Sequence, residues 1–235
     1  GGGGGGGVGG WGGDTGGRGE GSQDRLRELA RLLLIAGRGY QLLCQYRCKE
    51  AVDTFELLDP QQYCTGWVQH QVGRAYFEKG DYANAKLALE SMQRYDPHRM
   101  EGLEVLSTVL WHLKREVELS YLAQRVSDFD RMCPQTWCVV GNCFSLQKEH
   151  ETALRFFQRA IQVDVEMTYA YTLCGHEYVA NEDFAKATAC YRMAIRTDRR
   201  HYNAWYGLGA IYFRQEKFDM AEYHFRRALA INPQS

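Results

Sequence analysis

Three features are scarce in this sequence: excess charge, long uncharged apolar runs and metal-ligand spacings. Its 28 lysines and arginines are balanced by 29 acidic residues, which leaves a formal net charge of −1. Proteins that bind nucleic acid normally carry a clear basic excess that neutralises phosphates, so we expect no nucleic-acid partner. The best candidate for a membrane span, residues 32–35, falls far short of the roughly 20 apolar residues that cross a bilayer. We therefore expect no membrane contact.

Signals at the two ends of the chain are also scarce. The sequence starts with glycines, not with the basic and then apolar stretch of a secretory leader. It has no initiator methionine, and it stops abruptly at Ser235. We expect an intracellular piece of a longer protein.

The eight cysteines do not form a metal-binding pattern. No Cys-x-x-Cys pair occurs, and no histidine stands at a spacing that would complete a zinc site. The histidines also lack a nucleophile partner at a recognisable spacing, and the N-terminal glycines precede no Lys-Ser/Thr pair of a phosphate loop. We expect no metal, no cofactor and no enzymatic activity, with the cysteines acting as small, mostly buried apolar residues.

Residues 1–22 are mostly glycine and form a segment of their own. Such a stretch has few side chains to bury and a large backbone entropy to lose, so we expect it to be disordered. Arg18 lies in a Gly-Gly-Arg-Gly context that occurs in RNA-binding tails. A single match is weak evidence for an RNA-binding tail, so we expect this segment to be an inert linker.

What the sequence does contain is an internal repeat of 34 residues. Glycines stand on this grid at Gly39, Gly73, Gly141, Gly175 and Gly209. Alanines follow them twelve positions later, at Ala51, Ala85, Ala153, Ala187 and Ala221. Large residues follow the glycines by sixteen positions, at Phe55, Leu89, Phe157, Tyr191 and Phe225. A fourth set is aromatic and follows the glycines by three positions, at Tyr76, Phe144, Tyr178 and Tyr212.

This repeat predicts an all-α fold in which each unit is a pair of antiparallel helices. We expect each glycine to lie where the second helix crosses the first, with the alanine as its facing contact. The aromatic sets should fill the space between successive hairpins, because one hairpin cannot bury its apolar face alone. The array occupies residues 23–235, with units near 32–65, 66–99, 100–133, 134–167, 168–201 and 202–235.

The last unit resembles the tetratricopeptide repeat at every signature position. Its matching residues are Trp205, Leu208, Gly209, Tyr212, Ala221, Phe225, Ala228 and Pro233. Unit 100–133 departs from the pattern, because Ser107 replaces the glycine and Leu119 replaces the alanine. We expect its helices to pack further apart. The resemblance implies a right-handed superhelix of helical hairpins, a tetratricopeptide α-solenoid.

A narrower resemblance covers roughly residues 36–235. The runs GNCFSLQ at 141–147, FFQRAIQVD at 156–164 and HYNAWYGLG at 201–209 are similar to the cell division cycle protein 27 family of the anaphase-promoting complex, a ubiquitin ligase of mitosis. The resemblance implies a scaffold subunit of middle-to-late repeats, present in nucleus and cytoplasm. Its expected protein partners are neighbouring subunits and the C-terminal Ile-Arg tails of activators and of an accessory subunit.

In stacked hairpins of this type the first helices line the concave face, which marks candidate peptide-binding positions. Asn142 is the first of these, because its amide can both donate to and accept from a peptide backbone. Tyr169, Tyr206 and Phe213 are expected to form a pocket for the tail's isoleucine and to stack on its arginine. Thr172, His176 and Asn203 are further candidate contacts. Each aromatic is equally well explained as packing between repeats, and for His176 a packed or solvated histidine is favoured over a ligand contact.

Other functions of helical repeats stay open. A generic interaction module, such as a co-chaperone that clamps an acidic C-terminus with lysines, would place Lys at the fifth and ninth positions of the units. None occurs there. A repeat domain that guides substrates to a glycosyltransferase would need a catalytic domain that these residues do not contain. A helical-repeat RNA reader conflicts with the near-zero net charge.

Overall fold

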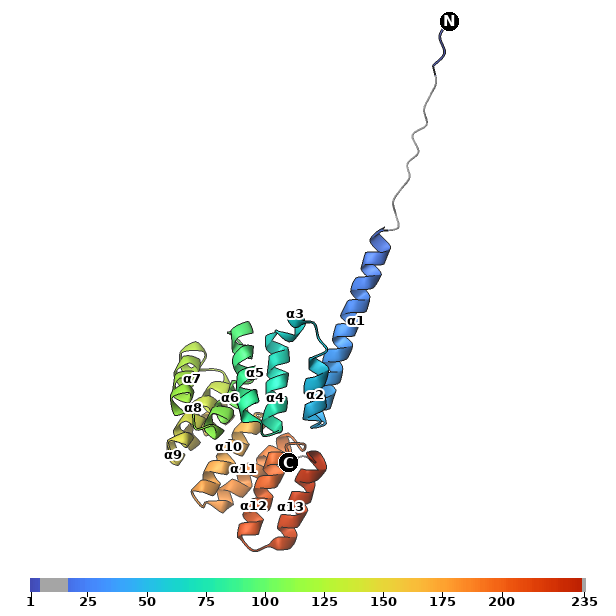
Figure 1. Cartoon of the computed structure of the whole chain (residues 1–235). Coiled ribbons are helices and arrows are strands. Elements are labelled where there is room, and N and C mark those ends of the chain that lie inside the picture. Colours follow the sequence, from blue (N-terminus) through green and yellow to red (C-terminus); the bar gives the residue numbers. More distant parts are fainter. Residues whose placement is uncertain (5–16, 234–235) are drawn as a thin grey trace.

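The computed structural model describes residues 1–4 and 17–233, and the helices of this part of the chain form one curved array (Figure 1). No strand occurs among these described residues. The first helices are α1 (Gly17–Cys44), α2 (Cys48–Phe55), α3 (Pro60–Tyr63), α4 (Gly66–Glu78), α5 (Tyr82–Tyr95), α6 (Leu103–His112) and α7 (Glu116–Phe129). They are followed by α8 (Pro134–Leu146), α9 (His150–Val163), α10 (Thr168–Ala180), α11 (Phe184–Thr197), α12 (Tyr202–Arg214) and α13 (Phe218–Ile231). The expected all-α solenoid of helical hairpins is confirmed.

One turn geometry joins the two helices of every hairpin. The turn residues with positive φ are Tyr46, Gly80, Lys114, Lys148, Glu182 and Glu216, again at the 34-residue spacing. A left-handed residue here lets the next N–H reach back to a carbonyl near the end of the first helix. Glu149 N, for example, donates to Phe144 O at 3.0 Å. The repeat is therefore defined by its turns as well as by its helix faces.

The atoms nearest to a Cβ built on each signature glycine belong to the large residue sixteen positions later; contact of the glycine with the alanine stays a prediction. A Cβ atom at Gly141 would lie 2.3 Å from a ring carbon of Phe157, and one at Gly175 would lie 2.4 Å from Tyr191. Gly39, Gly73 and Gly209 meet Phe55, Leu89 and Phe225 in the same way. The glycine thus makes room for a large side chain within its own hairpin. Members of this set also pack against the next unit, as expected: a Cβ at Gly207 would lie 2.5 Å from Tyr191, and the ring of Phe55 contacts that of Trp67.

The signature alanines are buried as well. Ala51, Ala85, Ala153 and Ala187 are fully buried, and Ala221 is 2% exposed. In unit 100–133 the sizes are exchanged: Ser107 and Leu119 are both fully buried, and small Ala123 stands where other units carry the large residue. In this unit the large residue, Leu119, therefore stands twelve positions after Ser107, and a small residue stands sixteen positions after it. That α6 and α7 pack further apart stays a prediction.

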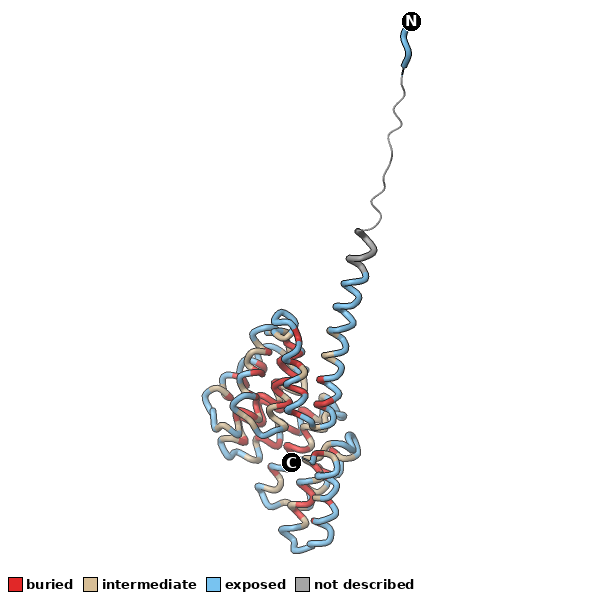
Figure 2. Tube along the Cα trace, turned by 45° about the vertical axis from the view of Figure 1, so that its right-hand side comes forward, coloured by how far each residue is buried: buried red, intermediate tan, exposed pale blue. Residues whose placement is uncertain are grey.

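Helix α1 differs from the expected segment boundaries. It begins at Gly17, so residues 17–22, which the sequence pattern places in the glycine-rich segment, belong to a helix. Residues 5–16 lie outside the described part of the chain, and so does most of that expected disordered segment. The helix projects away from the array (Figure 2), and Leu26, Leu29 and Leu33 on it are exposed.

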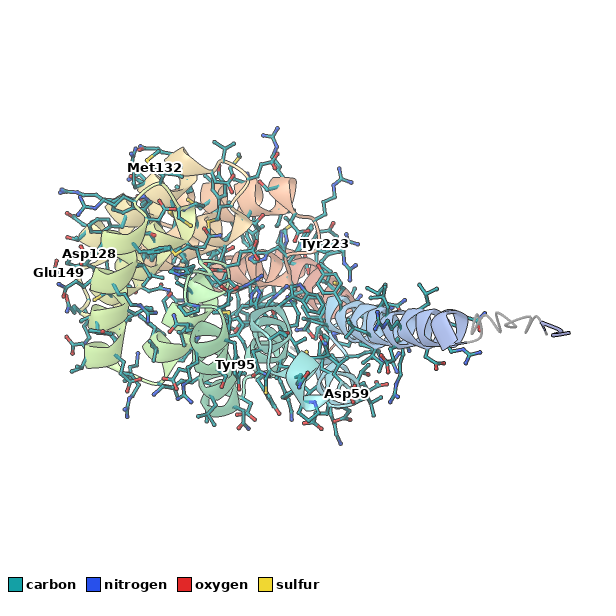
Figure 3. All side chains as sticks on the ribbon, turned by 90° about the horizontal axis from the view of Figure 1, so that it is seen from above. Asp59, Tyr95, Asp128, Met132, Glu149 and Tyr223 are labelled. Atoms are coloured by element: carbon teal, nitrogen blue, oxygen red, sulfur yellow. The ribbon has the colours of Figure 1, made fainter. Side chains whose placement is uncertain are left out.

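The array curls so that its last helices return to its first ones. In Figures 1 and 2, α12 and α13 lie close to the end of α1 and to α2. Figure 3 looks down on the molecule and shows the exposed side chains of Asp128 and Met132 at its outer edge. The first helices of the units face inward, where residues far apart in the sequence meet around a cavity.

Candidate peptide-binding groove

The inner face contains a half-open acidic cavity of about 270 Å³. It lies between the early units, through α4 and α6, and the late units, through α10 and the start of α12. Its lining residues are Tyr46, His70, Arg74, Phe77, Glu78, Glu104, Val105, Thr168, Tyr169, Asp198, His201, Tyr202 and Asn203. Three carboxyl groups and one guanidinium therefore share one small space, which favours a cation as the ligand.

Glu104 is the carboxyl group whose acidity the cavity changes most. Burial raises its pKa to about 7, although its side chain keeps some exposure to the cavity. One carboxylate oxygen accepts a hydrogen bond from Gly102 N at 2.9 Å, which fixes the side chain in place. A cation entering the cavity would favour the ionised form of this group and lower its pKa.

Glu78 stands at the end of α4 on the same wall. Burial raises the pKa of this carboxyl above its ordinary value, while a hydrogen bond from Tyr202 and the charge of Arg74 act in the opposite direction. The Tyr202 hydroxyl donates to Glu78 Oε2 at 2.8 Å. The other carboxylate oxygen of Glu78, Oε1, takes no part in this hydrogen bond.

His70 and Arg74 complete the wall formed by α4. Burial, with help from Arg74 and Arg99, lowers the pKa of His70 to about 3, so this imidazole is neutral at physiological pH. Its Nε2 atom is buried and has no hydrogen-bond partner among the described residues. Arg74 is the one cation lining the cavity, and it is partly exposed.

Asn142 lies beside this cavity, and its side-chain amide nitrogen already has hydrogen-bond partners within the protein. It is 3% exposed, and its amide nitrogen donates to Ser107 Oγ at 2.8 Å and to Thr108 Oγ1 at 2.9 Å. The serine that replaces the signature glycine of unit 100–133 is thus a hydrogen-bond partner of the next unit. That Asn142 contacts a bound peptide stays a prediction, and the amide nitrogen would first have to leave these partners.

Tyr169 and Asn203 are the candidate residues that line the cavity. The Tyr169 hydroxyl donates to Thr108 Oγ1 at 2.5 Å, and burial raises its pKa well above the ordinary value. Tyr206 and Phe213 do not line this cavity. They are 53% and 58% exposed, and their rings contact Phe225 and Phe218. Tyr206 and Phe213 therefore do not join Tyr169 in this cavity, and the pocket of three aromatic side chains stays a prediction.

Thr172 and His176 are tied to other side chains of the late units. Thr172 Oγ1 and His201 Nε2 are 2.8 Å apart, and His176 Nδ1 lies 2.9 Å from the Tyr191 hydroxyl. The surrounding protein lowers the pKa of His176 to about 4, although the ring itself stays exposed to the groove. Because its ring is exposed, His176 is the more accessible of the two to a ligand.

Several cavity residues were missed by the sequence reasoning. His70, Arg74 and Glu104 occupy the fifth and ninth positions of the early units, so the rule used for the late units would have found them. Glu78 and Asp198 lie outside those positions. They join the cavity only because the array curls, which the 34-residue pattern does not encode.

The described residues offer neither a membrane span nor a metal cluster. None of their helices is long and apolar enough to span a membrane. In the same part of the chain, no group of three or more histidine, cysteine, aspartate or glutamate side chains could hold a metal ion.

Comparison with known families and structures agrees with the repeat pattern. Two family models described as tetratricopeptide repeat match residues 68–99 and 202–235. A crystal structure of the APC/C hetero-tetramer Cut9-Hcn1 superimposes with a TM-score of 0.59 at 13% identity, covering 78% of this chain and 41% of that chain. At this identity the likeness concerns the fold.

Curated relatives give a closer match. Cell division cycle protein 27 homolog B of Arabidopsis thaliana is 52% identical over 208 residues, which is 88% of this chain and 28% of the relative. Anaphase-promoting complex subunit 3 of Schizosaccharomyces pombe is 44% identical over 220 residues, 92% of this chain and 33% of the relative. The chain thus spans about a third or less of the length of these relatives. Over the residues that align, it belongs to the family of the cell division cycle protein 27 homologues.

Proposed function

We propose that this chain is part of a non-catalytic scaffold subunit of the anaphase-promoting complex, acting in nucleus and cytoplasm. The names of the relatives and their identity of 44% and more support this role. In it, the inner face of the array receives the C-terminal Ile-Arg tails of activator and accessory subunits, while other subunits carry out the ubiquitin transfer.

The acidic cavity is the observation that carries the proposal. A C-terminal arginine brings a planar guanidinium with five donors, and the carboxylates of Glu78, Glu104 and Asp198 are the acceptors that such a group favours. The cavity volume of about 270 Å³ suits one side chain better than a folded segment. Tyr169 and Asn203 line the late side of the cavity, and we propose that they contact the residue before the arginine.

The charge of the cavity weighs against the co-chaperone alternative. A receptor for an acidic C-terminus needs cations on successive first helices. This cavity has one, Arg74, against three carboxyl groups. An acidic tail would meet repulsion where a basic tail meets attraction.

The test is fluorescence anisotropy with a labelled peptide ending in Ile-Arg, compared with the same peptide lacking those two residues. We expect binding that depends on the last two residues. Glu104→Gln keeps the shape and the acceptor for Gly102 N, and it should weaken binding about tenfold, or about 1.4 kcal/mol, by removing one charged partner. Asn142→Ala should weaken binding less, because its amide contacts Ser107 and Thr108 and acts on the groove through them.

Glu149→Gln is the matched control. Glu149 is exposed at the turn between α8 and α9, away from the cavity, and its substitution should leave the affinity unchanged. A folded chain that binds both peptides equally, or whose affinity falls equally with both glutamine variants, would contradict the proposed role of the cavity.

A further inference from the structure

Tyr46 stands out among the residues of the repeated turn. The five other positions of this set hold glycine, lysine or glutamate, whereas Tyr46 is a bulky aromatic residue with a φ of 58°. Such a conformation is rare for a large side chain and persists only when the surroundings hold it. Burial, the largest of several influences, raises the pKa of Tyr46 to about 12, which is in keeping with a hydroxyl that the protein covers.

The surroundings that hold Tyr46 come from the far end of the array. Its ring packs edge-on against the ring of Tyr202, with centroids 5.3 Å apart and an interplanar angle of 87°. Its hydroxyl donates to Arg200 O at 3.3 Å. In return, the Arg200 guanidinium donates to Cys44 O at 2.6 Å. Two turns that are separated by more than 150 positions in the sequence therefore contact each other directly.

These contacts close the wall of the acidic cavity. Tyr202, which packs on Tyr46, also donates to Glu78, so the contact continues into the cavity lining. Glu78 and Glu104 belong to the early side of the cavity, and Asp198 and Asn203 belong to the late side. A ligand that contacts both sides binds the closed array better than an open one. Its binding and the closure must then favour each other to the same extent.

We propose that Tyr46, Arg200 and Tyr202 form a latch that holds the array closed, and that closure of the latch and binding of a cationic peptide end strengthen each other. The second half of this proposal rests on the proposed function. The first half concerns the free chain and stands independently of any peptide.

The experiment uses the full chain and two pairs of variants. Arg200→Ala removes the bond to Cys44, and Arg199→Ala is its control, because Arg199 is an exposed neighbour whose side chain makes no contact across the two turns. Tyr46→Asn places a small residue that tolerates positive φ in the turn. Lys148→Asn places the same new residue in an equivalent turn, where the hydrogen bond from Gln147 to Glu116 reaches only the preceding unit. Circular dichroism melts show that each variant is folded.

Small-angle X-ray scattering of the peptide-free chain tests the latch. Arg200→Ala and Tyr46→Asn should increase the radius of gyration, and the two controls should not. Variants as compact as the parent chain would overturn the latch.

Anisotropy with the labelled Ile-Arg peptide tests the coupling. The two latch variants should bind about fivefold or more weakly, and saturating peptide should return part of their increase in size. An array that opens without any loss of affinity would overturn the coupling. If neither parent nor variants bind the peptide, the tail-receptor function and the coupling both fail, and the scattering comparison still decides the latch.

Discussion

At pH 7 the Glu104 carboxyl is close to half protonated, because burial raises its pKa from an ordinary 4.5 to about 7. Between these two values the folded chain holds a proton that the unfolded chain has released. The stability that comes from this group is therefore full below pH 4.5 and is lost as the pH rises through 7. Ionisation of Glu104 therefore destabilises the folded chain.

The first prediction follows from this cost. Glu104→Gln removes the titration and keeps the acceptor for Gly102 N, so the variant should be more stable than the parent at pH 8 by about 1–2 kcal/mol, after allowance for the partial exposure of the side chain. At pH 5 the difference should nearly vanish. Urea unfolding at the two pH values measures it, and an equal difference at both would contradict a raised pKa.

The second prediction concerns the glycines that face large side chains. Gly141→Ala places a Cβ 2.3 Å from the fully buried ring of Phe157, and overpacking of this kind destabilises by about 1–3 kcal/mol. Gly37, in the middle of α1, has no heavy atom within 4 Å of a Cβ built on it. Gly37→Ala should therefore stabilise the chain by about 0.5–1 kcal/mol. Thermal or urea unfolding of the two variants should show opposite signs.

At the residue scale the sequence pattern located the packing positions but not all of their contacts. Small residues at 34-residue spacing indicate close approach, and these positions are buried. Which residue each glycine faces depends on the rotation of the second helix. The glycine-to-aromatic contact became visible only in three dimensions, as did the bonds from Asn142 to Ser107 and Thr108.

At the scale of the helical element, the turn between paired helices is as regular as the helices themselves. Its left-handed residue is Gly80 in one unit, but lysine or glutamate in the four units that follow. Sequence reasoning looks for glycine or asparagine at such positions, and for this reason the repeated turn gave no signal. The helices were predictable because their apolar residues are periodic.

The third prediction uses this turn. A Cβ at Gly80 would meet no heavy atom within 4 Å, but its φ is 78°, so Gly80→Ala should cost about 1–2 kcal/mol through the backbone alone. Lys148→Gly, at the equivalent position with a φ of 65°, should stabilise by up to about 1 kcal/mol, since the left-handed cost exceeds the added freedom of the unfolded chain. Chemical unfolding of both variants measures this, and a Lys148→Gly variant clearly less stable than the parent would count against the explanation.

Polar contacts also join α6, α8 and α10, the first helices of three successive units. Trp111 Nε1 donates to Ser145 Oγ at 3.1 Å, Ser145 Oγ donates to Glu177 Oε1 at 2.6 Å, and His150 Nδ1 lies 2.6 Å from Glu177 Oε2. Buried polar groups of this kind require partners. The contacts run from the unit that departs from the repeat pattern into the two that follow it, and so hold that unit in register.

At the scale of the whole molecule, the repeat fixes the kind of fold but not the closure of the array. Each unit contributes a small rotation to its neighbour, and the sum of these rotations decides whether the two ends meet. The contacts of Tyr46 with Arg200 and Tyr202 are the result of that sum. Sequence reasoning placed the peptide groove on the late units alone, whereas half of the cavity wall belongs to the early ones.

The central claim is that the closed array presents an acidic cavity to the arginine at the end of a peptide. Its most direct test is one substitution in the ligand: citrulline in place of the C-terminal arginine, which keeps the shape of the side chain and removes its charge. Anisotropy titrations of the parent chain should show a loss of about tenfold or more, with a smaller loss for Glu104→Gln, which already lacks one charged partner. Equal affinity of the arginine and citrulline peptides would contradict the account, because the carboxyl groups of the cavity would then contribute nothing to recognition.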